Sequence, residues 1–295
     1  MNQTVSKGSL IVFISYIIWG FLTLFWSLLD DVNAFYILAQ RIAWSMVLMA
    51  GYLSVTGSWG EIKDIFHNKQ QMFTCFVSGI LVTINWGMYI YAVTNGHVLD
   101  SSLGYFIEPI LVALVGLLLF KETMSAAEKF TFCLAFAGVV YLIAVTHTIP
   151  IIALIISLSF CAYGAVKKKL VISAHASLFM ETLFMTPFAL IIIAYMEFNG
   201  TGSIGVLHGA EFILLPLCGF MTSLPLLLFS IGVKMIPYYI AGIIMYVSPT
   251  ITFILGLVYF HETLDVHRLV AFLLIWLGIA ITVGEKLKLM KTNAK

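Results

Sequence analysis

The feature that most constrains this chain is a succession of ten apolar runs, each close to the length of a helix that crosses a bilayer. A helix needs about 20 mostly apolar residues to span the hydrocarbon layer. The runs cover 8–28, 34–54, 72–94, 98–120, 126–146, 149–166, 174–196, 211–232, 237–260 and 266–284. They lack the period-two alternation of a barrel wall, so the pattern predicts an all-α integral membrane protein with ten transmembrane helices.

The composition supports a lipid environment. Hydrophobic residues make up 61% of the chain and charged residues only 10%, whereas soluble domains carry about 25% charged residues. With a net charge of +1, the chain cannot assemble the basic face that a nucleic acid requires, so no nucleic-acid partner is expected. The run 8–28 is too long for a signal-peptide core and lacks a small-residue cleavage site, which predicts an uncleaved first span.

The distribution of cations predicts the orientation. If the N-terminus is cytoplasmic, every lysine falls in a cytoplasmic segment or at its edge, whereas the opposite segments hold only Arg268. The remaining cation, Arg41, lies within a span. Because short cytoplasmic loops of membrane proteins are enriched in Lys and Arg, we expect both termini on the cytoplasmic side.

The chain contains an internal repeat. When the second half is aligned with the first, Phe120-Lys121-Glu122-Thr123 falls on Phe260-His261-Glu262-Thr263, and Pro109 falls on Pro249 in the same register. The repeat predicts two units, residues 8–146 and 149–284, each with five spans. Because five is odd, the second unit must enter the membrane in the opposite direction, which makes two inverted-topology five-helix repeats. This architecture recurs in secondary transporters, where the substrate site lies near the midplane.

Three ionisable residues lie deep within the predicted spans: Arg41, Glu108 and Glu181. Such groups are costly in lipid and commonly mark a substrate or proton pathway. One cation cannot neutralise both carboxylates, so we expect one of them to be hydrated or protonated. Two interpretations remain open: a substrate- or proton-binding site lined by the three residues, or a structural clamp in which Arg41 bridges helices.

Further residues are candidates for the same cavity or for its moving parts. Asn85, Trp86 and Tyr105 would add a polar and aromatic wall, although aromatic residues in membrane proteins also pack or face lipid. Pro109 and Pro249 are predicted helix breaks at matched positions, since proline removes an intrahelical hydrogen bond. The matched pair Glu122 and Glu262 is interpreted as a repeated capping or hinge feature.

No catalytic, metal-binding or cofactor-binding motif is found. The four cysteines Cys75, Cys133, Cys161 and Cys218 lie in apolar runs without metal-ligand spacing, and we interpret them as small buried hydrophobic residues. After His261-Glu262 the next histidine is His267, which is the wrong spacing for a zinc-protease helix. We therefore expect no enzymatic activity, no metal and no cofactor.

Several of these landmarks together resemble a known family. They are Trp19-Gly20, Gln40-Arg41, Asn85-Trp86, the stretch Gly104-Tyr105-Phe106-Ile107-Glu108-Pro109, Tyr163-Gly164 and Glu181-Thr182. The chain resembles the EamA-type carriers of the drug/metabolite transporter superfamily over nearly its whole length, and most closely the RarD branch. One departure is Glu108, where much of that branch is expected to carry Asn. The resemblance implies two inverted five-helix repeats, a central cavity, alternating access and a bacterial cytoplasmic membrane.

The sequence thus predicts a secondary membrane transporter that exports a small organic metabolite or drug-like compound. Its partners would be the lipid bilayer and a small-molecule substrate, and both a monomer and a homodimer are compatible with the sequence. A channel and a non-transporting scaffold or receptor are the alternatives. Saturable flux with counter-exchange would favour a carrier, unitary conductance a channel, and absence of any flux a scaffold.

Overall fold

The computed structural model describes residues 3–29, 31–94, 98–146, 151–261 and 266–293. The chain within these ranges is helical, and the one strand-like feature there is an isolated bridge between Ile204 and Leu207. The helices are α1 (Gln3–Trp26), α2 (Ala34–Thr56), α3 (Trp59–His67), α4 (Lys69–Thr94), α5 (Val98–Leu118), α6 (Ala126–Thr146), α7 (Ile151–Lys169), α8 (Ala174–Phe198), α9 (Leu214–Gly232), α10 (Tyr238–Met245), α11 (Val247–Val258) and α12 (Val266–Asn293), with short 3₁₀ segments η1 (Ser27–Leu29) and η2 (Gly209–Ile213).

Among the residues that the structure describes, eight helical segments are long and apolar enough to cross a membrane. They are Gln3–Leu29, Ala34–Thr56, Lys69–Tyr89, Ala126–Val145, Ile151–Lys169, Ala174–Phe198, Gly209–Gly232 and Tyr238–Val258. Two shorter apolar stretches, Ile107–Leu118 of α5 and Leu269–Glu285 of α12, lie among the described residues as well. The expectation of an all-helical membrane protein is therefore confirmed, with eight spans identified by length and composition.

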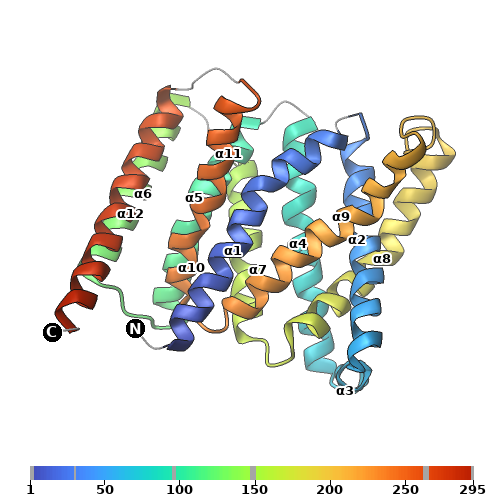
Figure 1. The fold of residues 1–295 in the computed structure, drawn as a ribbon, viewed down its shortest axis with the longest axis horizontal. Coiled ribbons are helices and arrows are strands. Elements are labelled where there is room, and N and C mark those ends of the chain that lie inside the picture. The colour runs from blue at the N-terminus through green and yellow to red at the C-terminus, as the bar shows by residue number, and fades with distance from the viewer. Residues whose placement is uncertain (1–2, 30, 95–97, 147–150, 262–265, 294–295) are drawn as a thin grey trace.

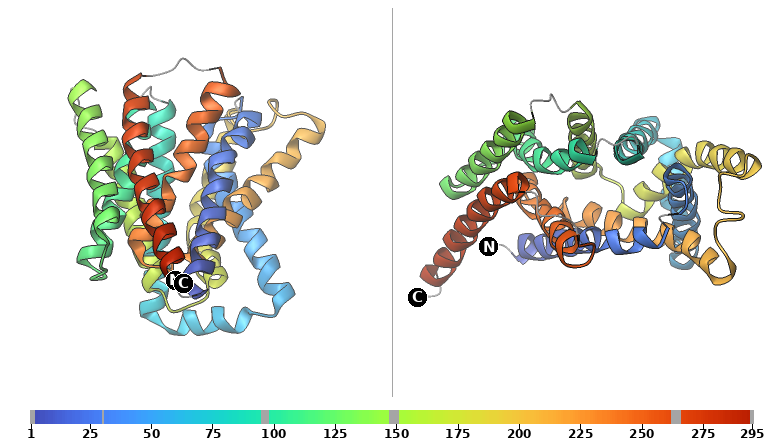
Figure 2. Two further views of the ribbon diagram at one scale, coloured as in Figure 1. Left: turned by 60° about the vertical axis from the view of Figure 1, so that its left-hand side comes forward. Right: turned by 90° about the horizontal axis from the view of Figure 1, so that it is seen from above.

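The helices are arranged in two rows, which are seen end-on in the right-hand view of Figure 2. One row holds α6, α5, α7, α4 and α8, and the other holds α12, α11, α1, α9 and α2. Contacts within the rows correspond: α5 with α7 and α11 with α1, α7 with α4 and α1 with α9, α4 with α8 and α9 with α2. The rows meet where α6 packs on α12, α2 on α8, and α5 on α10.

The start of α1 and the end of α12 lie at the same end of the molecule, the lower end in Figure 1. We call this the terminal end and the opposite one the far end. Helix α3 lies at the terminal end (Figure 1), as do the connections from α5 to α6, from α7 to α8 and from α9 to α10. Helix α3 and two of these connections carry Lys63, Lys121 and Lys234, and α7 ends at the same side with Lys167, Lys168 and Lys169.

The repeat extends to the helix boundaries. Helices α2 and α8 begin at equivalent positions of the two halves and both have a side-chain cap: Asn33 Oδ1 accepts from Phe35 N at 2.9 Å, and Ser173 Oγ accepts from Ala176 N at 3.2 Å. Such caps satisfy amide groups that lack a partner within the helix. After α5 and α11, the matched residues Lys121 and His261 both adopt a left-handed backbone, with φ of 53° and 52°.

The two predicted helix breaks differ. Helix α5 continues through Pro109, so the prediction of a break there is wrong. Pro249 is the third residue of α11, immediately after the interruption between α10 and α11 at Tyr246. Proline is tolerated in a first turn because those amides have no intrahelical acceptor. The prediction that all four cysteines are buried is also corrected, because Cys133 is exposed.

Candidate functional site

Arg41 is held between aromatic rings near the far end. It lies seven residues after the start of α2, about 10 Å along the helix. Its Nε donates to Thr222 Oγ1 of α9 at 2.9 Å. Its Cζ lies 4.6 Å from the ring centroid of Trp26 and 4.4 Å from that of Trp86, a distance at which a guanidinium is attracted to an aromatic face. Because Trp26 and Trp86 come from different rows, Arg41 lies between the rows.

The aromatic wall beside Arg41 is continued by Tyr89 and Tyr105. Both lie within electrostatic range of the guanidinium, and their rings pack edge to face with centroids 6.0 Å apart. Tyr105 keeps 37% of its surface exposed. Asn85 has a different role, because its Nδ2 donates to the carbonyl of Ile156 at 2.7 Å and fastens α4 to α7 in the buried interior.

Glu108 lies buried near the middle of α5, with 5% of its surface exposed. Its carboxyl group is within electrostatic range of Tyr16, Tyr238 and Tyr246. Among the residues that the structure describes, no cation forms an ion pair with Glu108. Tyr105 is within electrostatic range of both Glu108 and Arg41.

Three buried hydroxyl groups in the described parts of α1 and α9 lack a hydrogen-bond partner. Within the described part of the chain, the buried hydroxyls of Tyr16, Ser223 and Ser230 have no hydrogen-bond partner. Buried polar groups in proteins are nearly always paired with protein or with ordered water. Ordered water between α1 and α9 would satisfy these hydroxyls.

Glu181 forms an ion pair that the sequence pattern does not reveal. Lys167 Nζ lies 2.5 Å from Glu181 Oε1, and the two side chains are 0% and 1% exposed. Ser78 and Ser177 also donate to this oxygen, at 2.9 and 2.7 Å. The sequence-based expectation of one buried cation for two buried carboxylates is therefore wrong, because Lys167 is a second buried cation. The predicted span 149–166 ends just before this lysine, but α7 continues to Lys169 and carries Lys167 into the core.

The three predicted residues therefore have separate partners. Arg41 and Glu181 stand at equivalent positions of the two halves, each seven residues into its helix. Each bonds to a hydroxyl on a corresponding helix, Arg41 to Thr222 of α9 and Glu181 to Ser78 of α4. Equivalent positions of the two units thus carry opposite charges, one towards the far end and one towards the terminal end.

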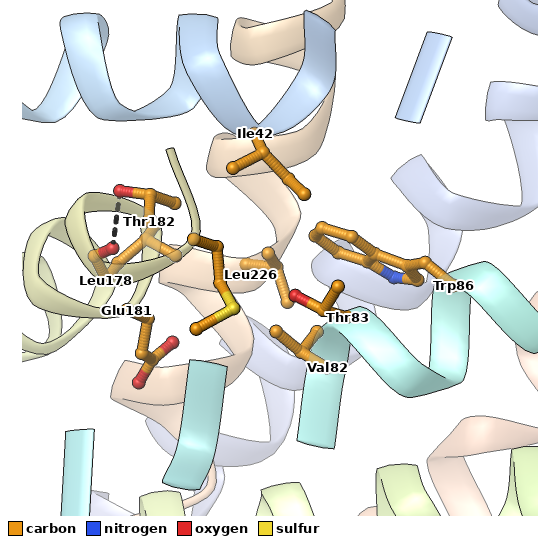
Figure 3. A pocket seen from close by; sticks show the side chains of 9 residues that line it. Ile42, Val82, Thr83, Trp86, Leu178, Glu181, Thr182 and Leu226 are labelled. Carbon is orange, nitrogen blue, oxygen red and sulfur yellow. Dashed lines mark hydrogen bonds between the residues drawn. The ribbon is translucent and has the colours of Figure 1, made fainter. Parts of the chain in front are cut away.

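A small pocket lies between these two groups. It is lined by Ile42, Val82, Thr83, Trp86, Leu178, Glu181, Thr182, Met185 and Leu226, and Trp86 and Glu181 stand on opposite sides of it (Figure 3). Its volume of about 10 Å³ is room for roughly one water molecule. Mainly apolar side chains thus fill the space between the surroundings of Arg41 and the buried ion pair.

A second polar network joins the connections at the terminal end. Glu122 accepts from the amides of Tyr238 and Tyr239 at 2.6 and 3.1 Å and so caps the start of α10. Lys168 Nζ lies 3.5 Å from Glu122 and donates to the carbonyl of Ile236. The capping interpretation holds for Glu122, whereas its counterpart Glu262 lies outside the described residues.

Lys234 extends this network, because its Nζ donates to the carbonyl of Ile172 at 2.6 Å. Burial, together with repulsion from Lys167, lowers the pKa of the Lys234 ammonium below its usual value. The terminal end is therefore closed by side chains that bind the backbone of neighbouring connections.

Glu122→Ala is expected to lower the free energy of unfolding by about 1 kcal/mol, because two amides at the start of α10 lose their acceptor. SDS-driven unfolding in mixed micelles would measure the change. Asp64→Asn on the exposed face of α3 is the matched control, with an expected change within about 0.5 kcal/mol. Equal stability of Glu122→Ala and the wild type would contradict the capping role.

Comparison with known proteins finds relatives that match nearly the whole chain. The sequence matches the EamA-like transporter family over residues 6–144 and again over 146–284. The uncharacterized transporter YojE of Bacillus subtilis is 36% identical, over 96% of this chain and 95% of that protein. Protein RarD of Escherichia coli is 30% identical, over 98% of both chains.

The fold is also found in a solved structure. A protein of known crystal structure superposes with a TM-score of 0.71 at 16% identity, covering 94% of this chain and 96% of that one. The family match covers both halves of the chain, and the RarD similarity covers nearly all of it. The chain therefore belongs to the EamA-like transporter family, and within it to the RarD-like proteins.

Proposed function

We infer that the protein is a secondary transporter of a small organic solute, working by alternating access between two five-helix units, residues 8–146 and 149–284. The observation that carries this proposal is the correspondence of contacts between the two rows, in which α5 with α7 matches α11 with α1, and α4 with α8 matches α9 with α2. Two units that exchange contacts in this way can adopt two similar conformations, each open to one side.

The proposed orientation has the terminal end in the cytoplasm of a bacterial cell and the far end outside. The lysines of α3 and of the terminal-end connections support it, since cytoplasmic loops are rich in Lys and Arg. Ten helices in two units of five, with the units facing opposite ways, would bring both termini to this side.

The described conformation supports a barrier on the terminal side. Lys167 and Glu181 are sealed from solvent there, and the neighbouring pocket holds about one water molecule. Arg41, the equivalent of Glu181, is only half-buried. In this proposal the Lys167–Glu181 pair is a gate that separates when the interior opens to the cytoplasm. Glu108 and Tyr105 would line the interior between the two gates.

Two measurements test the proposal. Lys121→Cys and His261→Cys, made singly in a cysteine-free background, should be labelled by an impermeant maleimide from opposite sides of the membrane. Labelling of both cysteines from the same side would contradict the inverted arrangement. The purified protein in liposomes should then show saturable flux with counter-exchange of a solute found by metabolite profiling of overproducing cells. Unitary conductance would indicate a channel, and absence of flux a scaffold.

Export of the solute in exchange for protons is the direction proposed. Glu108 supports it, because a buried carboxyl without an ion-pair partner in the described residues can exchange a proton with the interior. Glu108→Gln should abolish the dependence of flux on an imposed pH step while solute counterflow persists. A variant with unchanged rate and unchanged pH dependence would exclude this role.

A further inference from the structure

The guanidinium of Arg41 has donors that the protein does not use. Its Nε is bonded to Thr222, and both indoles lie within cation–π distance of its Cζ. Within the described residues, its two terminal nitrogens have no hydrogen-bond partner. The residue as a whole is half-buried, and it lies between α1 and α4, which belong to different rows.

Unpaired guanidinium donors inside a membrane protein require a partner. A planar guanidinium with aromatic rings stacked on it keeps its in-plane N–H groups free, and their fork matches the two oxygens of a carboxylate. The two indoles also restrict the rotation of the side chain, so less entropy is lost when a ligand binds. The arrangement is therefore preorganised for an oxyanion.

The charge around Arg41 selects the kind of anion. Among the described residues, the titratable groups within electrostatic range of Arg41 are Cys218, Tyr89 and Tyr105, and no second cation is among them. Beyond Tyr105 lies Glu108, which is within electrostatic range of the same hydroxyl. One cation balances a single negative charge, whereas a doubly charged phosphate would stay half-neutralised in a low-dielectric interior and face a carboxyl group.

We propose that Arg41 binds the carboxylate of a small organic monoanion, whose flat apolar body lies against Tyr89 and Tyr105. This inference rests on the proposed transport function and names its substrate class. Tyr89 and Tyr105 suit such a body, since their edge-to-face rings form a wall and Tyr105 is partly exposed. Aromatic walls with a few placed polar groups are typical of small-molecule sites.

The competing explanation is that Arg41 only clamps α2 to α9 through Thr222. The two explanations differ in what Thr222→Val does. In that variant the clamp would lose its hydrogen bond between Arg41 and residue 222. The terminal nitrogens of Arg41 would still be available to bind a carboxylate. The conservative variant Arg41→Lys keeps the charge and loses the planar fork.

The test measures binding of benzoate, with benzyl alcohol and phenylphosphate as neutral and doubly charged comparisons. Purified protein in nanodiscs would be titrated by calorimetry. Benzoate is expected to bind the wild type and Thr222→Val with similar affinity. The affinity should fall about tenfold or more in Arg41→Lys and be lost in Arg41→Gln. Lys129→Gln, at an exposed cation of α6, should bind like the wild type.

Equal binding of benzoate and benzyl alcohol, or benzoate binding that survives in Arg41→Gln, would overturn the inference. Tighter binding of phenylphosphate than of benzoate would show that the site prefers a dianion, and it would also overturn the inference. Should Arg41→Gln not fold, the comparison of Arg41→Lys with Thr222→Val decides. Flux of a neutral or cationic solute without benzoate binding would leave the transport function standing and remove this inference. Arg41-dependent binding of benzoate without flux of any solute would leave this inference standing and remove the transport function.

Discussion

Glu181→Met should lower the free energy of unfolding by about 3–5 kcal/mol, because it leaves the ammonium of Lys167 buried without its counter-ion. Lys167→Met should cost a similar amount, since Glu181 would keep only hydroxyl donors, those of Ser78 and Ser177 among them. SDS-driven unfolding in mixed micelles would give both values. These are the largest expected effects of single charge removal in the described chain, since the two side chains are 0% and 1% exposed.

The double variant Lys167→Met/Glu181→Met distinguishes loss of the ion pair from a general disturbance of packing at the two positions. With both charges removed, stability should return to within about 1–2 kcal/mol of the wild type, because a well-packed apolar pair can replace a buried ion pair. Lys169→Met, at an exposed position of the same helix, is the matched control and should change little. Additive losses in the double variant would mean that Lys167 and Glu181 are not energetically coupled.

Gly219→Ala should destabilise the packing of α9 against α2. A Cβ at this position would lie 2.5 Å from the carbonyl carbon of Trp44 and 2.8 Å from the amide nitrogen of Ser45. Neither backbone atom can move without separating the two helices. Overpacking of this kind costs about 1–3 kcal/mol, and Gly219→Leu should prevent assembly of α9 with α2. Close approach at small residues is the main attraction between helices in lipid.

The repeat supplies a graded series for this prediction. Gly79 lies in α4, the helix that corresponds to α9, and a Cβ there would lie 3.0 Å from the carbonyl oxygen of Glu181, so Gly79→Ala should cost less. Gly51, inside α2, has nothing within 4 Å. Gly51→Ala should therefore stabilise the protein by about 0.5–1 kcal/mol through helix propensity. Melting temperatures in detergent should fall in the order Gly51→Ala, wild type, Gly79→Ala, Gly219→Ala, and any other order would contradict the packing argument.

The helices are predictable because lipid leaves few alternatives for long apolar runs. The runs, the internal repeat and the resemblance carried by Gly104 to Pro109 together indicate the fold class and the family. These signals are local or periodic, so a single sequence displays them.

The partners of the buried charges are not predictable in this way. Lys167 belongs to a run of three lysines, and such a run ordinarily marks the edge of the membrane. Its burial depends on Glu181, which lies on the next helix, and on the continuation of α7 to Lys169. Likewise, nothing near Arg41 in sequence reveals that Trp26 and Trp86 flank it.

The two prolines show a further limit of sequence alignment. Pro109 and Pro249 are aligned in the repeat, yet only Pro249 adjoins a helix interruption. Its position in a first turn removes the conflict with the backbone, because the amide that proline lacks would have no intrahelical acceptor there. Matched residues in the two halves therefore need not have matched backbones.

The neutralisation of Glu181 has a consequence for any charged solute that travels between the two ends. The potential of a lone carboxylate falls off as the inverse of distance, whereas that of a closely spaced pair of opposite charges falls off faster. With Lys167 2.5 Å away, Glu181 neither repels anions nor attracts cations over a long range. In the transport mechanism proposed above, the buried Lys167–Glu181 pair would therefore discriminate by size, and among these two equivalent positions discrimination by charge would fall to Arg41.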